Sequence, residues 1–130
     1  MSAPDEMTPY ATSLRLWPAE GVIEHPGGLV KRLLEEVAAR SEQMSASLIG
    51  HIECHVRGAD GAGFHGRLTS SRLGAAIGGS VPESASELRV DLVVLVYGLE
   101  GPQVEAAVAA ALDSLCAGGE IFWGNQGEKC

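Results

Sequence analysis

Residues 87–97 read Glu-Leu-Arg-Val-Asp-Leu-Val-Val-Leu-Val-Tyr, and this run decides the fold. Apolar residues take every second position from Leu88 to Val96, which is the two-residue period of a β-strand. Val93 and Leu95 make the opposite face partly apolar as well. Because strands that are apolar on both faces are typical of the inside of a sheet, we predict that this strand is central.

The preceding segment predicts a β-hairpin. Residues 47–57 and 64–70 alternate in the same way and are joined by a glycine-bearing connection. The expected buried face of the first strand consists of Leu48, Gly50, Ile52, Cys54 and Val56. If the two apolar faces coincide, Val56 lies opposite Phe64, His55 opposite His65, and Glu53 opposite Arg67. A slip by one residue would turn one apolar face to water, so we expect this register.

Two amphipathic helices flank the predicted strands. Residues 27–43 carry apolar side chains with helical spacing, and residues 102–117 begin with Pro102 and end before Gly118-Gly119. Short strands are also expected at 13–17, 75–77 and 120–123. The pattern predicts an α+β two-layer sandwich, an antiparallel sheet of three to five strands with both helices on one face.

The expected domain organisation is simple. Residues 1–12 are predicted to be a flexible N-terminal arm, residues 13–123 a single α+β domain, and residues 124–130 a polar C-terminal tail. The amino end carries Asp5 and Glu6 and has no apolar run, so we expect no signal peptide and a cytoplasmic location. The longest strongly apolar run is far too short to span a bilayer, which predicts no membrane insertion.

The charge balance excludes some classes of partner. The chain of 130 residues has 17 acidic and 9 basic side chains, for a net charge of −8. Most of the surplus lies in residues 1–43 (−3) and 98–130 (−4), whereas residues 44–97 carry only −1. Binding to nucleic acid is driven by Lys and Arg, so we expect no nucleic-acid partner and look to the nearly neutral middle segment for a partner site.

One polar cluster could bind a metal ion. In the predicted register, His55, His65 and Glu53 lie close enough on one sheet face to converge on zinc or another divalent transition metal, with a fourth position open. His51 is too far along the strand to join them. The alternative interpretation is ordinary cross-strand polar pairing, with Arg67 neutralising Glu53.

No catalytic motif is found, which favours a non-enzymatic domain. Cys54 is predicted to point away from the neighbouring histidines, so neither can act as its base. We therefore expect a small interaction or accessory domain that self-associates or binds another protein through its sheet. Aromatic residues and arginine are enriched at interfaces, and the expected interface residues are Trp17, Arg67, Arg89, Val93, Leu95 and Trp123.

Residues 88–98 followed by residues 103–112 resemble the strand-plus-helix part of the alkaline-shock protein family. The resemblance covers about a quarter of the chain, and the histidine-bearing hairpin has no counterpart in it. We therefore take no function from it.

Overall fold

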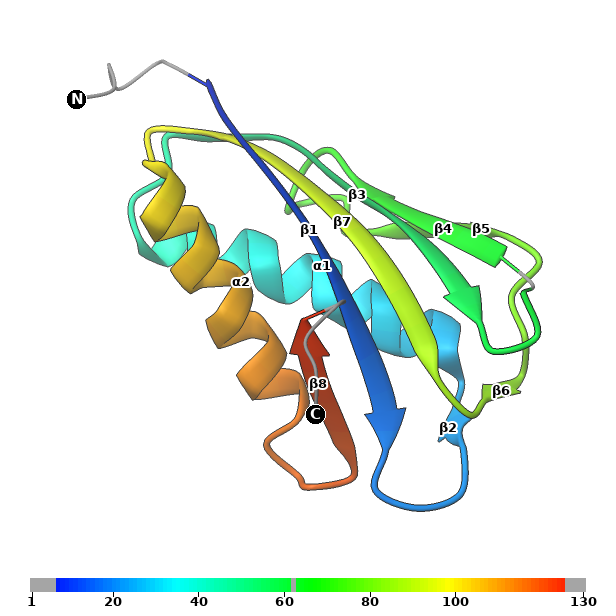
Figure 1. Cartoon of the computed structure of the whole chain (residues 1–130). Coiled ribbons are helices and arrows are strands. Elements are labelled where there is room, and N and C mark those ends of the chain that lie inside the picture. The colour runs from blue at the N-terminus through cyan, green and yellow to red at the C-terminus, as the bar shows by residue number, and fades with distance from the viewer. Residues whose placement is uncertain (1–6, 62, 126–130) are drawn as a thin grey trace.

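The computed structural model describes residues 7–61 and 63–125 and shows an α+β fold (Figure 1). Its main sheet has six strands, in the order β5-β4-β3-β7-β1-β8, and every neighbouring pair is antiparallel. These strands are β1 (Met7–Pro18), β3 (Leu48–Gly58), β4 (Gly63–Leu68), β5 (Ala76–Gly79), β7 (Leu88–Tyr97) and β8 (Ile121–Asn125). The helices are α1 (Pro26–Gln43) and α2 (Gly101–Leu115), and β2 (Ile23–Glu24) pairs with β6 (Ser84–Ala85) in a separate small sheet.

The strand β7 is central, as predicted, because it pairs with β3 on one side and β1 on the other. Since both partners are antiparallel to β7, they run parallel to each other, and α1 connects them in sequence. This arrangement is the split β-α-β motif, in which the strand between the two parallel strands comes from a later part of the chain. The motif places three long strands side by side.

The prediction of three to five strands is wrong, because the main sheet has six. The prediction of a flexible N-terminal arm is also wrong for residues 7–12, the part of it that the structure describes. Residues 7–12, assigned to that arm, form the first half of β1 and pair with β7. Pro9 argued against a strand in this segment, since proline is rare inside sheets. The strand tolerates it because, among the described residues, β8 pairs only with Leu14–Pro18, so that the Pro9 part of β1 has a partner strand on one side alone. The tail predicted from residue 124 begins inside β8, and residues 126–130 lie outside the described part.

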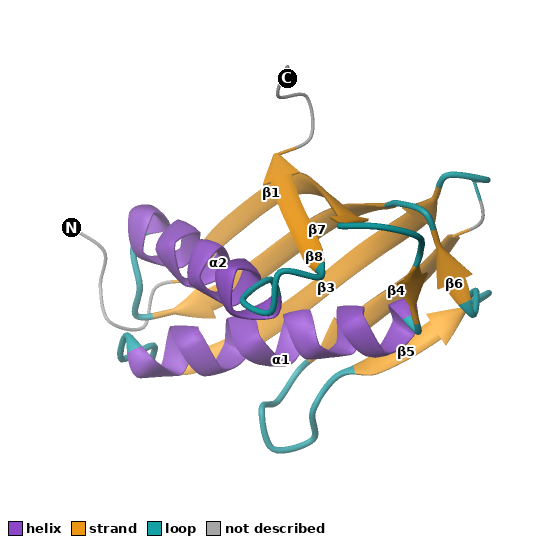
Figure 2. Ribbon diagram, turned by 90° about the horizontal axis from the view of Figure 1, so that it is seen from below, coloured by secondary structure: helices purple, strands orange, loops and turns teal. Residues whose placement is uncertain are grey.

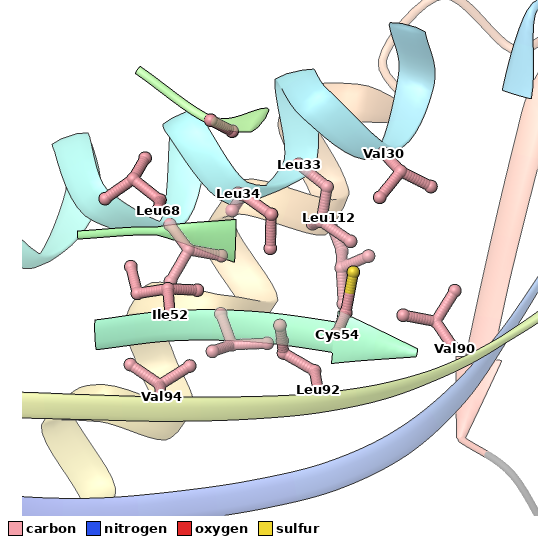
Figure 3. Close-up of a cluster of buried hydrophobic side chains, with 14 of the residues drawn as sticks. Val30, Leu33, Leu34, Ile52, Cys54, Leu68, Val90, Leu92, Val94 and Leu112 are labelled. Atoms are coloured by element: carbon pink, nitrogen blue, oxygen red, sulfur yellow. The ribbon is translucent and has the colours of Figure 1, made fainter. Parts of the chain in front are cut away.

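Both helices lie on the same side of the sheet (Figure 2). The hydrophobic core is formed by side chains of the helices and of the sheet face that they cover. On the central strand β7 the inward-facing side chains, among them Val90, Leu92 and Val94, are buried in strict alternation. They meet the helix side chains Val30, Leu33, Leu34 and Leu112, as Figure 3 shows. The other face of the sheet is not covered by any described element.

The hairpin of β3 and β4 has the predicted register, with Val56 opposite Phe64 and His55 opposite His65. The beginning of β3 differs from the prediction. A β-bulge at Gly50 shifts the pairing with β7 between Ile49 and His51. An extra residue in one strand reverses the faces beyond it, so Ile49 is buried whereas Leu48 is 59% exposed.

The close packing of β4 against α1 generates a prediction about Gly66. A Cβ atom at this position would lie 2.8 Å from Leu34 Cδ1 and 3.0 Å from Ile77 Cδ1, and Leu34 is fully buried. We expect Gly66→Ala to lower the free energy of unfolding by about 1–3 kcal/mol, because overpacking forces the core to shift. Urea unfolding followed by circular dichroism measures the change.

Gly28 provides the matched control. It lies in the first turn of α1 with nothing within 4 Å of an added Cβ, so Gly28→Ala should be neutral or stabilise the protein by up to about 1 kcal/mol. Equal unfolding free energies for wild type and Gly66→Ala would contradict the packing described above.

Candidate functional site

The candidate site is the sheet face that the helices leave uncovered, which we call the outer face. Strand register places its side chains in rows across β4, β3, β7 and β1. Toward one end of the strands the outer face is apolar on β7 and β1, with His51 and Glu53 beside them on β3, and toward the other end it is charged. The apolar end consists of Met7, Pro9, Ala11, Leu48, Val93, Leu95 and Tyr97.

The side chains of the apolar end are accessible in varying degrees. Leu48 and Met7 are 59% and 43% exposed, and Val93 and Leu95, two of the predicted interface residues, are half-buried. The apolar residues of β7 and β1 lie side by side, because Val93 pairs with Ala11 and Leu95 pairs with Pro9. Seven neighbouring apolar side chains on a sheet face that no described element covers make the apolar end a candidate interaction site.

The charged end contains three arginines directly opposite one another, which we call the arginine row. Arg57 on β3 pairs with Arg89 on β7, and Arg89 pairs with Arg15 on β1. Like charges in direct cross-strand pairs destabilise a sheet. Two carboxylates offset part of this repulsion: Glu87 lies 3.2 Å from Arg15 and 3.5 Å from Arg89, and Asp91 lies 4.0 Å from Arg57.

Two aromatic rings, those of Trp17 and Phe122, lie next to the arginine row toward the edge of the sheet. The Arg15 guanidinium carbon lies 5.1 Å from the centre of the Trp17 ring, within the range of a cation–π interaction. The ring centre of Trp17 lies 6.4 Å from that of Phe122 on β8. Trp17, predicted to lie in an interface, is therefore part of the charged end of the outer face.

Trp123 was predicted as an interface residue together with Trp17, but it lies on the opposite face. It pairs with the buried Leu16, packs against the core and donates a hydrogen bond of 3.0 Å from Nε1 to Asp113 Oδ1 of α2. The physical reason is the alternation of β8, which places Phe122 on the outer face and Trp123 on the helix side.

The predicted metal ligands occupy neighbouring positions on the hairpin, but their side chains do not converge. The Glu53 carboxylate lies 3.0 Å from His51 Nε2 and 4.0 Å from Arg67, and the hydrogen bond from His51 lowers the pKa of Glu53. The ring of His65 lies over Gly78 of β5, with Nε2 only 2.8 Å from the position of an added Cβ. Among the described residues, no group of three or more His, Cys, Asp or Glu is placed to hold a metal ion.

His51 was excluded from the predicted metal site, yet its ring lies closer to the Glu53 carboxylate than Arg67 does. A strand rise of about 6.6 Å separates residues i and i+2, which long side chains bridge. Arg67, predicted both to neutralise Glu53 and to lie in the interface, does contact this carboxylate.

Two shallow hollows lie beside the histidine pair. The larger, of about 390 Å³, is lined by the histidines together with Arg57, Phe64 and Asp91, and the smaller, of about 260 Å³, by Glu53, Cys54 and Arg67 among others. Cys54 itself is buried, and this burial raises the pKa of its thiol to about 11. The thiol is therefore protonated at neutral pH, which does not suit a nucleophile.

Sequence reasoning missed the arginine row as a unit. Arg89 was predicted as an interface residue, but Arg15 and Arg57 were not linked to it. Each arginine alternates with apolar residues in its own strand, which is the only signal available in the sequence. That the three lie side by side depends on the register of β1 and β3 against β7.

Comparison of the chain with protein-family models, curated proteins and solved structures gives no match. Among the described residues, neither helix has the length and apolar character required to cross a membrane. Any functional conclusion must therefore come from the surface itself.

The ion pairs of Glu87 predict a pH dependence of stability. The hydrogen bond from Arg15, and then the charge of Arg15 and the contact with Arg89, hold the pKa of Glu87 below its usual value. A depressed carboxyl pKa contributes stability that is present above the unfolded-state pKa and is lost as the pH falls through the folded-state pKa. The free energy of unfolding of the wild type should therefore fall between neutral and acidic pH. In Glu87→Gln we expect this fall to be smaller, by less than about 1 kcal/mol.

Urea unfolding of wild type and Glu87→Gln at a series of pH values measures this difference. Glu105→Gln, which removes an exposed carboxylate on α2, is the control. The same pH profile for wild type and Glu87→Gln would show that these ion pairs contribute nothing to stability.

Proposed function

We propose that the protein is a non-enzymatic interaction domain that binds a protein partner, or a second copy of itself, through the outer face. The observation that carries this proposal is the apolar end, where seven apolar side chains lie together on a sheet face that no described element covers. Burial of such side chains stabilises an association by about 25 cal/mol per Å² of apolar surface. The mixture of apolar residues with arginine and aromatic rings also fits the composition of protein interfaces.

Position-specific cross-linking tests this proposal. A photoreactive amino acid at Val93 samples the apolar end, and the same amino acid at Ala106, exposed on α2, samples the helix side. We expect irradiation to yield a defined cross-linked species from position 93 and little from position 106. A covalent dimer of the purified protein identifies a second copy, and a heterologous species from an extract of the cells that make the protein identifies a partner by mass spectrometry.

A substitution beside the photoreactive group completes the experiment. Leu95→Glu places a charge in the apolar end and should abolish the cross-link, whereas Ala106→Glu, with the same change in charge on α2, should leave the cross-link from position 93 intact. The proposal fails if position 93 gives no more cross-linked product than position 106, or if both charge substitutions have the same effect.

The alternative function is binding of zinc or another divalent transition metal. It is favoured by the register, in which His55 lies directly opposite His65 with Glu53 two residues away on the same strand and face. Metal binding would require the His65 ring to turn from Gly78 toward His55. Imidazole and carboxylate ligands of this kind suit a zinc ion with an open coordination position.

Titration calorimetry with zinc tests this alternative. If the site exists, wild type should bind one ion and the double variant His55→Ala/His65→Ala none. His25→Asn is the control, because His25 is not part of the hairpin but precedes α1, and asparagine tolerates its left-handed backbone (φ 52°). Absence of saturable binding, or equal binding by the double variant, would eliminate the metal-binding function.

A further inference from the structure

We propose that the arginine row binds an acidic segment of a partner protein, with Asp or Glu carboxylates of that segment on Arg57 and Arg89. The inference rests on the proposed function and specifies the chemistry of the partner. It starts from the direct opposition of three arginine residues across β3, β7 and β1. Across the usual strand spacing of about 4.8 Å, the row extends for roughly 10 Å.

The guanidinium groups of Arg57 and Arg89 are available to a ligand. Their side chains are 65% and 56% exposed, and their ion pairs are long, at 4.0 Å to Asp91 and 3.5 Å to Glu87. Each guanidinium has five N–H donors, so most of these donors remain free for carboxylate oxygens. Arg15 is more firmly held, because it contacts Glu87 at 3.2 Å and lies against Trp17.

The distribution of charge selects an anionic ligand. In the part of the chain that the structure describes, the outer face presents four arginines against three carboxylates: Arg15, Arg57, Arg67 and Arg89 with Glu53, Glu87 and Asp91. The whole chain carries −8, so this face is basic relative to the rest of the molecule. An added carboxylate would relieve the repulsion within the arginine row, whereas elsewhere it would meet an acidic surface.

The same distribution favours an acidic protein segment over the other candidates. A nucleic acid presents continuous negative charge, which the net charge of −8 and the interspersed Glu87 and Asp91 would repel. A two-fold dimer centred on the arginine row would bring six guanidinium groups together. A protein segment can supply isolated carboxylates for Arg57 and Arg89 and apolar side chains for the neighbouring apolar end.

Fluorescence anisotropy of a labelled peptide of alternating glutamate and leucine tests the inference. We expect the wild-type protein to bind this peptide and not the matched peptide with glutamine in place of glutamate. The double variant Arg57→Gln/Arg89→Gln should lose affinity by about tenfold or more. The control Arg32→Gln/Arg72→Gln removes the same charge from exposed arginines on α1 and in the loop after β4, and should change affinity by less than about twofold.

A substitution that is expected to increase binding provides a second test. The Glu87 carboxylate contacts both Arg15 and Arg89 and therefore competes with a ligand carboxylate. Glu87→Gln should increase peptide affinity by about two- to threefold, whereas Glu105→Gln, with the same change in net charge on α2, should not. Circular dichroism of each variant shows whether the fold is retained.

Several results would overturn the inference. They are no saturable binding of the acidic peptide, equal losses for the two double arginine variants, or tighter binding of a labelled oligothymidylate with the same dependence on Arg57 and Arg89. If the cross-link from position 93 persists in Arg57→Gln/Arg89→Gln, the interaction domain stands and the acidic-segment inference fails. If no cross-link forms in any variant, the proposed function itself fails, whatever the peptide shows.

Discussion

The structure depends on the antiparallel pairing of β7 with two strands that come from distant parts of the chain. Ten pairs of residues register β7 against β1, and a nearly continuous ladder registers it against β3. Because side chains alternate, this double registration directs Val90, Leu92 and Val94 to the helices. It directs Arg89, Val93 and Leu95 to the outer face at the same time. The core and the candidate site are therefore two results of one constraint.

The two faces of the sheet differ in how completely their apolar side chains are packed and their charges are paired. On the helix side, apolar residues fill a core in which a single added methyl group, as at Gly66, would meet Leu34 at 2.8 Å. On the outer face, apolar side chains remain accessible and three arginines repel one another with incomplete compensation. A surface that leaves both apolar area and like charge unsatisfied is less stable alone than with a complementary partner, which is why the functional proposals concern this face.

Much of the fold follows from local periodicity. The two helices, the central strand and the hairpin register of His55 with His65 were predictable, because apolar spacing is strong in each segment and the turn between β3 and β4 is short. The first half of β1 was not, since Pro9 argues against a strand unless the pairing of that segment is known. The reversal at Leu48 and Ile49 was also hidden, because a bulge depends on the partner strand and leaves no periodic signal.

The candidate site was predictable only in part. Val93, Leu95, Arg67 and Arg89 reach the outer face through the alternation of their own strands, and the sequence alone determines that. The sequence also determines the acidic surplus of the chain and the nearly neutral middle segment. Only the tertiary structure decided that Arg15, Arg57 and Arg89 form one row, that Glu53 turns to His51, and that Trp123 faces the helices. Alternation fixes the face of a side chain within a strand, whereas its neighbours depend on strand order and register, which are set by packing over the whole chain.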